Sequence, residues 1–390
     1  MSPFSRRQFL TRTSASALAA PVLLAGGAAP SEAATDAAHS TAGGEFNLSM
    51  GFPEGALRLG FNENPLGPSQ KAIAGAIAAI PGSYRYALSW ELRPLIAAHH
   101  AVDKDWVLIG NGSTEVLTTV PVAFARDKAN VVAALETWDE MLVVAENMGT
   151  SVKRIKLLKD KNYAYDVDGM LAAVDADTRV FMIISPNNPT GSTLDYAQLK
   201  KIADALPKKT LFVIDQAYAD YLPEGKTGID LVKEGYRNVL VTRTFSKAHA
   251  MAGLRCGYGI AHPEVLKEIA KFACGPGSTN MAVFGAVEGS LRDPAHIERS
   301  RAWVRSSHAW YQQQCAKSAM QLVAGPSPFA LIAVGAGRGK AVQEALRARK
   351  VFINDGARWH LPGYIRVSYG LEKENQTFFN ELTEIMQRKA

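Results

Sequence analysis

Short apolar runs that alternate with helical stretches are the feature that most restricts the fold of this chain. The stretches between the runs are long enough for crossover helices, and this alternation is typical of a largely parallel sheet whose strands are buried on both faces. The runs are WVLIG (106–110), NVVAAL (130–135), RVFMIIS (179–185), TLFVID (210–215) and NVLVTRTFS (238–246). The sequence therefore predicts an α/β domain with a mostly parallel central sheet.

The C-terminal quarter has a different pattern and predicts a second, smaller α+β domain. A chain of 390 residues exceeds the ~250–300 residues that one hydrophobic core serves. From about residue 290, a long helical stretch leads to FALIAV (329–334), a helix-like segment (339–350), YIRVSYG (364–370) and a last helix around 377–388. The predicted domains are a signal peptide (1–34), an N-terminal arm with part of the small domain (35–84), a large cofactor-binding domain (85–285) and a small C-terminal domain (286–390).

The N-terminal residues resemble a twin-arginine export signal. SRRQFL (5–10) precedes an apolar stretch (15–29), and Ser31-Glu32-Ala33 offers a small-x-small cleavage site. The apolar stretch is shorter than the ~20 residues of a membrane-spanning helix. We expect a protein exported through the twin-arginine machinery to the periplasm, without a stable membrane anchor.

Charge and cysteine usage exclude two classes of site. The formal net charge is +6, but no basic run is interleaved with aromatic residues, which argues against nucleic-acid binding. Cys256, Cys274 and Cys315 have neither metal-ligand spacing nor the pattern of a disulfide framework. No metal site is predicted.

Polar residues follow several of the predicted strands, where ligands bind in open α/β sheets. After WVLIG, the turn NGSTEVL places Ser113 and Thr114 at the start of a helix, where free backbone N–H groups and the helix dipole favour a phosphate. A simple helix cap is the alternative explanation for these two residues.

Asp215 and Lys247 follow the next strands and point to one cofactor. Asp215 ends a strand and needs a cationic partner if it is buried, such as a protonated ring nitrogen. A lysine among apolar residues suits a Schiff base, although Lys247 taken alone could be a solvated turn residue. Thr244, Ser246 and Arg255 can join Thr114 around a phosphate. A phosphate, a ring nitrogen and an aldehyde together describe pyridoxal 5′-phosphate.

The chain resembles the fold-type I aminotransferases of class I/II, and within them the histidinol-phosphate aminotransferase branch. The resemblance extends from NENPLGPS (62–69) to IRVSYG (365–370). It implies that Lys247 forms the Schiff base, that Asp215 pairs with the pyridine nitrogen, and that Asn188 of NNPTG and Tyr218 hydrogen-bond the ring hydroxyl. The catalytic residues it implies are Lys247, Asp215 and Tyr218.

The same resemblance assigns the remaining site residues. It implies that Ser113, Thr114, Thr244, Ser246 and Arg255 hold the phosphate and that Trp138 stacks on the ring. Tyr86 matches a tyrosine that reaches the phosphate of the neighbouring subunit's cofactor, which implies a homodimer with shared active sites. Arg366 matches the arginine that binds the anionic end of the substrate.

Two departures from this branch concern the substrate. Leu66 stands where a tyrosine is usual, and Asn354 stands where an arginine is usual; both usual residues help to bind the substrate phosphate. Gln216 in DQAY replaces a usual glutamate and is expected to be tolerated. We expect an ordinary α-amino acid with an uncharged or aromatic side chain to be preferred, and histidinol phosphate to be a poor substrate.

The predicted function is amino transfer between an α-amino acid and a 2-oxo acid. Two alternatives stay open: a histidinol-phosphate aminotransferase, or a decarboxylase, lyase or cyclase that uses pyridoxal phosphate on the same scaffold. The lysine, the aspartate and the phosphate-binding residues are common to all of them. A cofactor-binding transcription regulator would need a DNA-binding module, for which the first 60 residues hold no pattern.

Overall fold

The computed structural model of the protein describes residues 51–126 and 128–387. The predicted signal peptide (1–34) and the start of the predicted arm (35–50) lie outside these residues. Within the described ranges, every helix is too short or too polar to cross a membrane.

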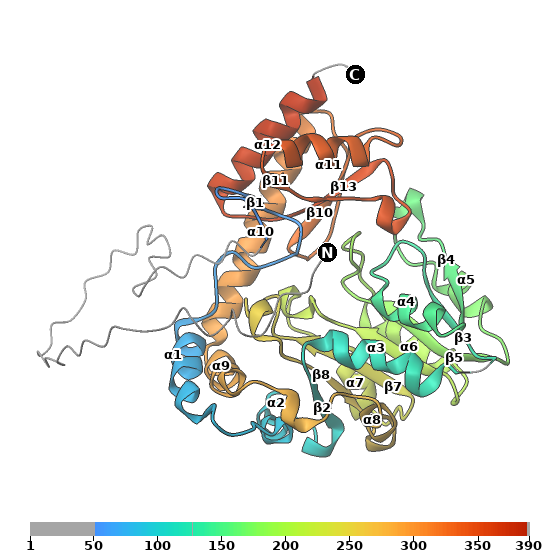
Figure 1. The fold of residues 1–390 in the computed structure, drawn as a ribbon. Helices are drawn as coiled ribbons and strands as arrows, with labels where there is room; N and C mark the ends of the chain where they lie inside the picture. The colour runs from blue at the N-terminus through green and yellow to red at the C-terminus, as the bar shows by residue number, and fades with distance from the viewer. Residues whose placement is uncertain (1–50, 127, 388–390) are drawn as a thin grey trace, which may run out of the picture. The chain divides into compact units, whose positions relative to one another are not determined.

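A seven-stranded sheet forms the centre of the large part of the chain, and it confirms the predicted α/β fold (Figure 1). The strand order is β2-β8-β7-β6-β5-β3-β4, and the pairs from β7 to β4 are parallel, whereas β8 is antiparallel to both its neighbours. The strands are β2 (Val107–Gly110), β3 (Asn130–Ala134), β4 (Ser151–Ile155), β5 (Thr178–Ile184), β6 (Leu211–Asp215), β7 (Val239–Thr244) and β8 (Gly257–Ala261). The sequence pattern had not indicated β4 or β8.

Helices cover both faces of this sheet because successive strand residues point to opposite sides. On β5, Val180 and Met182 pack into one core cluster, whereas Phe181 and Ile183 pack into another. The first cluster includes residues of α3 (Ser113–Phe124), α4 (Glu140–Asn147) and α8 (Pro263–Ala270). The second includes residues of α2 (Arg93–His100), α5 (Val167–Ala172), α6 (Tyr196–Ala205) and α7 (Gly228–Lys233).

The C-terminal part has its own antiparallel sheet of four strands, in the order β12-β13-β10-β9. Its elements are β9 (Leu322–Ala324), β10 (Phe329–Ala333), α11 (Gly339–Ala348), β12 (Asn354–Asp355), β13 (Tyr364–Ser368) and α12 (Glu372–Gln387). β1 (Leu57–Arg58) pairs in parallel with β11 (Val351–Phe352), so the start of the described chain joins this part. The predicted domain boundaries stay a prediction.

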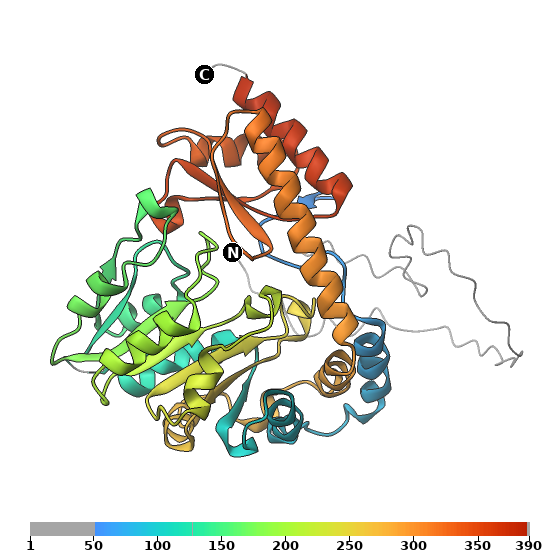
Figure 2. The ribbon, with the colours of Figure 1, turned by 180° about the vertical axis from the view of Figure 1, so that it is seen from behind.

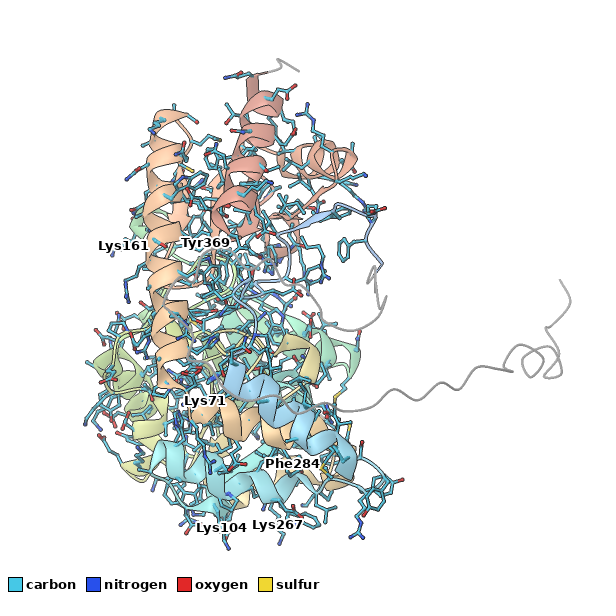
Figure 3. The ribbon with its side chains drawn as sticks, turned by 90° about the vertical axis from the view of Figure 1, so that its left-hand side faces the viewer. Lys71, Lys104, Lys161, Lys267, Phe284 and Tyr369 are labelled. Atoms are coloured by element: carbon cyan, nitrogen blue, oxygen red, sulfur yellow. The ribbon has the colours of Figure 1, made fainter. Side chains whose placement is uncertain are left out.

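Three helices connect the two parts: α1 (Gln70–Ala79), α9 (Met281–Leu291) and the 24-residue α10 (Pro294–Lys317), which Figure 2 shows as one continuous helix. α1 and α9 lie side by side (Figure 3), because glycines let their backbones touch: a Cβ on Gly75 would come 2.0 Å from the Gly285 carbonyl oxygen. Short 3₁₀ turns complete the fold, namely η2 (Ile80–Gly82), η3 (Ser89–Leu92), η4 (Lys104–Trp106), η5 (Lys159–Lys161), η6 (Ala219–Tyr221), η7 (Ala252–Leu254), η8 (Pro276–Ser278) and η9 (Ala357–Trp359).

Candidate active site

A cavity of about 490 Å³ lies where the carboxyl ends of β5, β6 and β7 meet the start of α3, η9 and β13. The structure brings most of the predicted site residues to its walls. These are Ser113, Thr114, Trp138, Asn188, Asp215, Tyr218, Thr244, Ser246, Lys247, Arg255, Asn354 and Arg366. Residues that are distant in the sequence thus form one site.

Lys247 follows β7, and its Nζ donates a hydrogen bond to the Phe61 carbonyl oxygen at 2.9 Å. Burial, the charge of Arg366 and that of Arg255 lower the pKa of Lys247 to about 8, while Glu63 and Asp215 oppose the shift. A depressed pKa leaves part of the amine neutral near physiological pH, which is the form that attacks an aldehyde.

Asp215 is the last residue of β6 and is almost fully buried. Its Oδ1 accepts hydrogen bonds from Thr242 Oγ1 at 2.8 Å and from the Ala217 backbone N–H at 3.2 Å. Burial raises the pKa of Asp215 to about 6, against the effect of these two donors. Within the described ranges, no basic side chain forms an ion pair with Asp215. A protonated ring nitrogen would supply the charge that this carboxylate lacks.

The first turn of α3 faces hydroxyl groups and a guanidinium from the loops after β7. Gly112 precedes this helix with φ +82° and contributes no side-chain cap, so the helix dipole and the N–H groups of the first turn remain available to a ligand. Thr244 Oγ1 donates to Ser246 Oγ at 3.0 Å, and Arg255 Nη1 approaches the same oxygen at 3.5 Å. This set of donors suits a phosphate.

Two glycines are required for this arrangement. A Cβ on Gly257 would come 2.1 Å from the backbone nitrogen of Ser113, and a Cβ on Gly112 would come 2.4 Å from Arg255 Nη2. Side chains at these positions would fill the space between the helix start and Arg255. The donors, the buried Asp215 and the amine of Lys247 therefore fit pyridoxal 5′-phosphate.

Tyr218 is held by Asn62, a residue that the sequence reasoning had not singled out. Asn62 Nδ2 donates to the Tyr218 hydroxyl oxygen at 2.9 Å, and the Asn62 backbone N–H donates to Ser368 Oγ at 2.7 Å. Burial raises the pKa of Tyr218 to about 12, so the phenol keeps its proton. Asn62 has φ +55°, and an asparagine in a turn motif is the signal that could have identified it.

Arg366 projects from β13 and is buried. Its Nη1 donates to Asn188 Oδ1 at 2.7 Å, its Nη2 donates to the Gly60 carbonyl oxygen, and its guanidinium carbon lies 4.6 Å from the centroid of the Trp359 ring. Burial lowers the pKa of Arg366 to about 10, and the group remains charged at neutral pH. No carboxylate forms an ion pair with it among the residues described.

Two further cavity residues, Glu63 and Arg358, are charged, and both form ion pairs. Glu63 pairs with Arg58 at 3.1 Å, and Arg358 of η9 pairs with Asp139 at 3.1 Å. Asn354 Nδ2 donates to the Gly60 carbonyl oxygen. Neither Glu63 nor Arg358 was predicted as a site residue. Glu63 lies within NENP without a role of its own there, and no motif surrounds Arg358.

Leu66 and Tyr86 do not line the cavity of their own chain. Leu66 lines a separate hollow with His296 and Trp303, so within one chain its side chain does not shape the site. Tyr86 is 86% exposed and is absent from the residues that line the cavity. The role predicted for Tyr86, across a dimer interface, stays a prediction.

Known proteins resemble this chain over most of its length. Residues 54–381 match the family aminotransferase class I and II. The histidinol-phosphate aminotransferase 1 of Cupriavidus pinatubonensis is 32% identical over 334 residues, which cover 84% of this chain and 88% of that protein. The histidinol-phosphate aminotransferase of Symbiobacterium thermophilum is 33% identical, with coverages of 84% and 89%.

The solved structures agree with the fold. The histidinol-phosphate aminotransferase of Sinorhizobium meliloti, determined in complex with pyridoxal-5′-phosphate, superposes with a TM-score of 0.79 at 24% identity and covers 86% of this chain and 92% of that one. Together with the family match, the cavity confirms the predicted enzyme class. The chain belongs to the class I and II aminotransferases, and it is a pyridoxal-phosphate-dependent transaminase.

Proposed function

We propose that this enzyme moves an amino group between an α-amino acid and a 2-oxo acid, with the substrate carboxylate on Arg366. The observation that carries the proposal is a buried guanidinium, without a carboxylate partner among the described residues, in the same cavity as Lys247. A planar guanidinium binds a carboxylate through two parallel hydrogen bonds.

The side chains then have distinct tasks. When bound, pyridoxal phosphate supplies the electron sink for the amino-transfer chemistry. Lys247 supplies the amine that holds the cofactor and can move a proton at the substrate α-carbon. Asp215 keeps a proton on the ring nitrogen, and Asn188 and Tyr218 orient the ring. The first turn of α3 and Arg255 anchor the phosphate.

Histidinol phosphate is the second candidate substrate, because the relatives described above are named histidinol-phosphate aminotransferases. Two features favour an amino acid instead. The amide of Asn354 is engaged with the Gly60 carbonyl oxygen and brings no charge to the cavity. Trp138 and Trp359 both line the cavity and offer apolar ring surface to an uncharged or aromatic side chain.

Steady-state kinetics on both substrate types test the proposal. The loaded enzyme should transfer the amino group of a common amino acid, uncharged or aromatic, to a 2-oxo acid with a higher kcat/KM than that of histidinol phosphate. A higher value for histidinol phosphate than for every common amino acid would refute the substrate assignment. Release of carbon dioxide or ammonia without any need for a 2-oxo acid would identify a decarboxylase or lyase.

We also propose that the active enzyme is a homodimer. Five large hydrophobic side chains between residues 77 and 90 are exposed, a density that is unusual for a monomer surface. They are Ile77, Ile80, Tyr84, Tyr86 and Trp90. A second copy of the chain is the partner that would place Tyr86 at a cofactor phosphate.

Complementation of two inactive variants tests shared sites. Lys247→Ala and Tyr86→Ala proteins, mixed under conditions that exchange subunits, should form hybrids with one site that has both residues. Activity should then rise above that of either variant alone. A monomeric mass in light scattering, or mixtures no more active than the parents, would refute the dimer with shared sites.

We also propose export to the periplasm, from SRRQFL (5–10), the apolar stretch (15–29) and the small-x-small site at Ser31-Glu32-Ala33. Replacement of both arginines, Arg6→Lys with Arg7→Lys, should retain the protein in the cytoplasmic fraction of a bacterial host. Secretion that survives this double replacement would exclude the twin-arginine pathway.

A further inference from the structure

Arg358 is a cavity residue to which neither the family resemblance nor the proposed function gives a task. It lies in η9, four residues after Asn354, and its side chain is half exposed. Lys247 and Arg255 serve the cofactor, and Arg366 serves the α-carboxylate. Arg358 is the remaining cation among the described cavity residues.

Arg358 and Arg366 lie beside one indole ring. The guanidinium carbon of Arg366 is 4.6 Å from the centroid of Trp359, and that of Arg358 is 5.9 Å from it. The charge of Arg358 also contributes, after burial, to the lowered pKa of Arg366. Two like charges held this close to each other favour a ligand that brings an anion to each of them.

The counterion of Arg358 can be replaced at little cost. Asp139 follows the cavity residue Trp138 in the sequence, and its Oδ1 accepts a hydrogen bond from Arg358 Nη2 at 3.1 Å. Arg358 is 53% exposed and Asp139 is 23% exposed. Ion pairs at this degree of exposure contribute little to stability, so a ligand carboxylate can take the place of Asp139.

We propose that Arg358 is a specificity-determining residue, which binds the second carboxylate when a dicarboxylic substrate occupies the cavity. The proposal rests on the assignment of the α-carboxylate to Arg366. When a substrate with an uncharged side chain occupies the cavity, Asp139 neutralises Arg358. One cavity thereby accepts both kinds of side chain.

Binding of acids that do not react gives the first test, with the holoenzyme and isothermal titration calorimetry. Succinate and butyrate have the same number of carbons and differ by one carboxylate. The wild type should bind succinate at least tenfold more tightly, and Arg358→Gln should abolish this preference while butyrate binding stays unchanged. Asp139→Asn should tighten succinate binding severalfold, because Arg358 loses its competing partner.

Arg237 offers a matched control. It forms one exposed ion pair, with Glu264 at 2.8 Å, and it does not line the cavity. Arg237→Gln should leave both affinities at the wild-type values. Equal affinity of the wild type for succinate and butyrate would refute the proposal. So would equal losses for both acids in Arg358→Gln, or a loss of succinate affinity in Asp139→Asn, since these outcomes indicate a structural ion pair.

Kinetics separate this proposal from the proposed function. With one amino donor, Arg358→Gln should raise the KM for 2-oxoglutarate about tenfold or more and leave the KM for 2-oxovalerate unchanged, with kcat nearly constant for both. Absence of amino transfer from any donor would overturn the proposed function. The calorimetric comparison of succinate with butyrate would still test whether Arg358 binds a second carboxylate. An unchanged ratio of the two KM values in the variant would refute Arg358 as the specificity residue.

Discussion

The cofactor end and the substrate end of the cavity are built in different ways. At the cofactor end, Asp215 terminates β6, Lys247 lies just beyond β7, and the phosphate donors start α3. Each position is set by the hydrogen-bond register of one central sheet. At the substrate end, Arg366 from β13 and Arg358 from η9 meet Gly60 and Asp139 of other segments. The central sheet therefore fixes the positions of the cofactor-binding residues. The positions of the substrate-binding residues depend instead on contacts between segments that are distant in the sequence.

The largest effect should come from the amine at the cofactor end. Lys247→Ala, purified with pyridoxal phosphate present, should lose the visible absorption of lysine-bound cofactor and reduce amino transfer to background, because no other lysine lines the cavity among the described residues. Absorption spectroscopy and turnover measure both. Lys267→Ala, an exposed lysine on α8, is the control and should behave as the wild type. Normal turnover of Lys247→Ala would refute the assignment.

Asp215→Asn should reduce kcat about 10³-fold, which corresponds to ~4 kcal/mol of lost transition-state stabilisation. The amide cannot keep the ring nitrogen protonated, but it is nearly the same size and can still accept the hydrogen bond from Thr242. The midpoint of thermal unfolding should therefore change little. Rates within tenfold of the wild type would contradict the role of Asp215.

The raised pKa of Asp215 also predicts a pH dependence of stability in the cofactor-free protein. Because the folded pKa is about 6 and the ordinary value is 3.8, the folded state binds the proton more tightly. The proton on Asp215 therefore stabilises the folded state, and this contribution is complete below pH ~4. As the pH rises through ~6 the contribution is lost, and the free energy of unfolding falls by about 3 kcal/mol. Urea unfolding at several pH values measures it. The same slope in Asp215→Asn would show that other groups cause it.

Arg366→Gln should lower kcat/KM by about tenfold to a hundredfold, through loss of a charge-assisted hydrogen bond of ~1.5–3 kcal/mol. Most of the change should lie in KM, since Arg366 binds the carboxylate before and during the reaction. Arg366→Lys should recover part of the loss. A change confined to kcat would place the residue in the chemistry rather than in binding.

The smallest effect is expected at Leu66. Its side chain lines a hollow apart from the cavity, so Leu66→Tyr should change kcat/KM less than about threefold for any substrate. A large gain for histidinol phosphate would show that residue 66 reaches a substrate after all, across a dimer interface.

The sequence predicted the cofactor end well because its chemistry lies at strand ends, and strands buried on both faces leave a clear apolar signal. The five predicted runs correspond to β2, β3, β5, β6 and β7. β4 was not indicated because its residues are only half buried, and β8 because Gly257 and Gly259 interrupt its apolar pattern. The substrate end could not be predicted in full. The partners of Arg358 and Asn62 lie 219 and 306 residues away, and only the folded chain brings them together.

α10 has a mechanical consequence for access to the cavity. Near its start, Ser300 Oγ donates to the Ala248 carbonyl oxygen next to Lys247, and Arg301 Nε donates to the Asp220 carbonyl oxygen. Further along, Tyr311 belongs to the core cluster that contains both Tyr218 and Phe329. The helix thus acts as a strut: a rotation of the C-terminal sheet must bend α10 or expose this apolar core to water. Release of Arg358 from Asp139 requires neither a bent α10 nor an exposed core. Small acids can therefore enter the cavity through rotation of one side chain, without a hinge movement between the two parts of the chain.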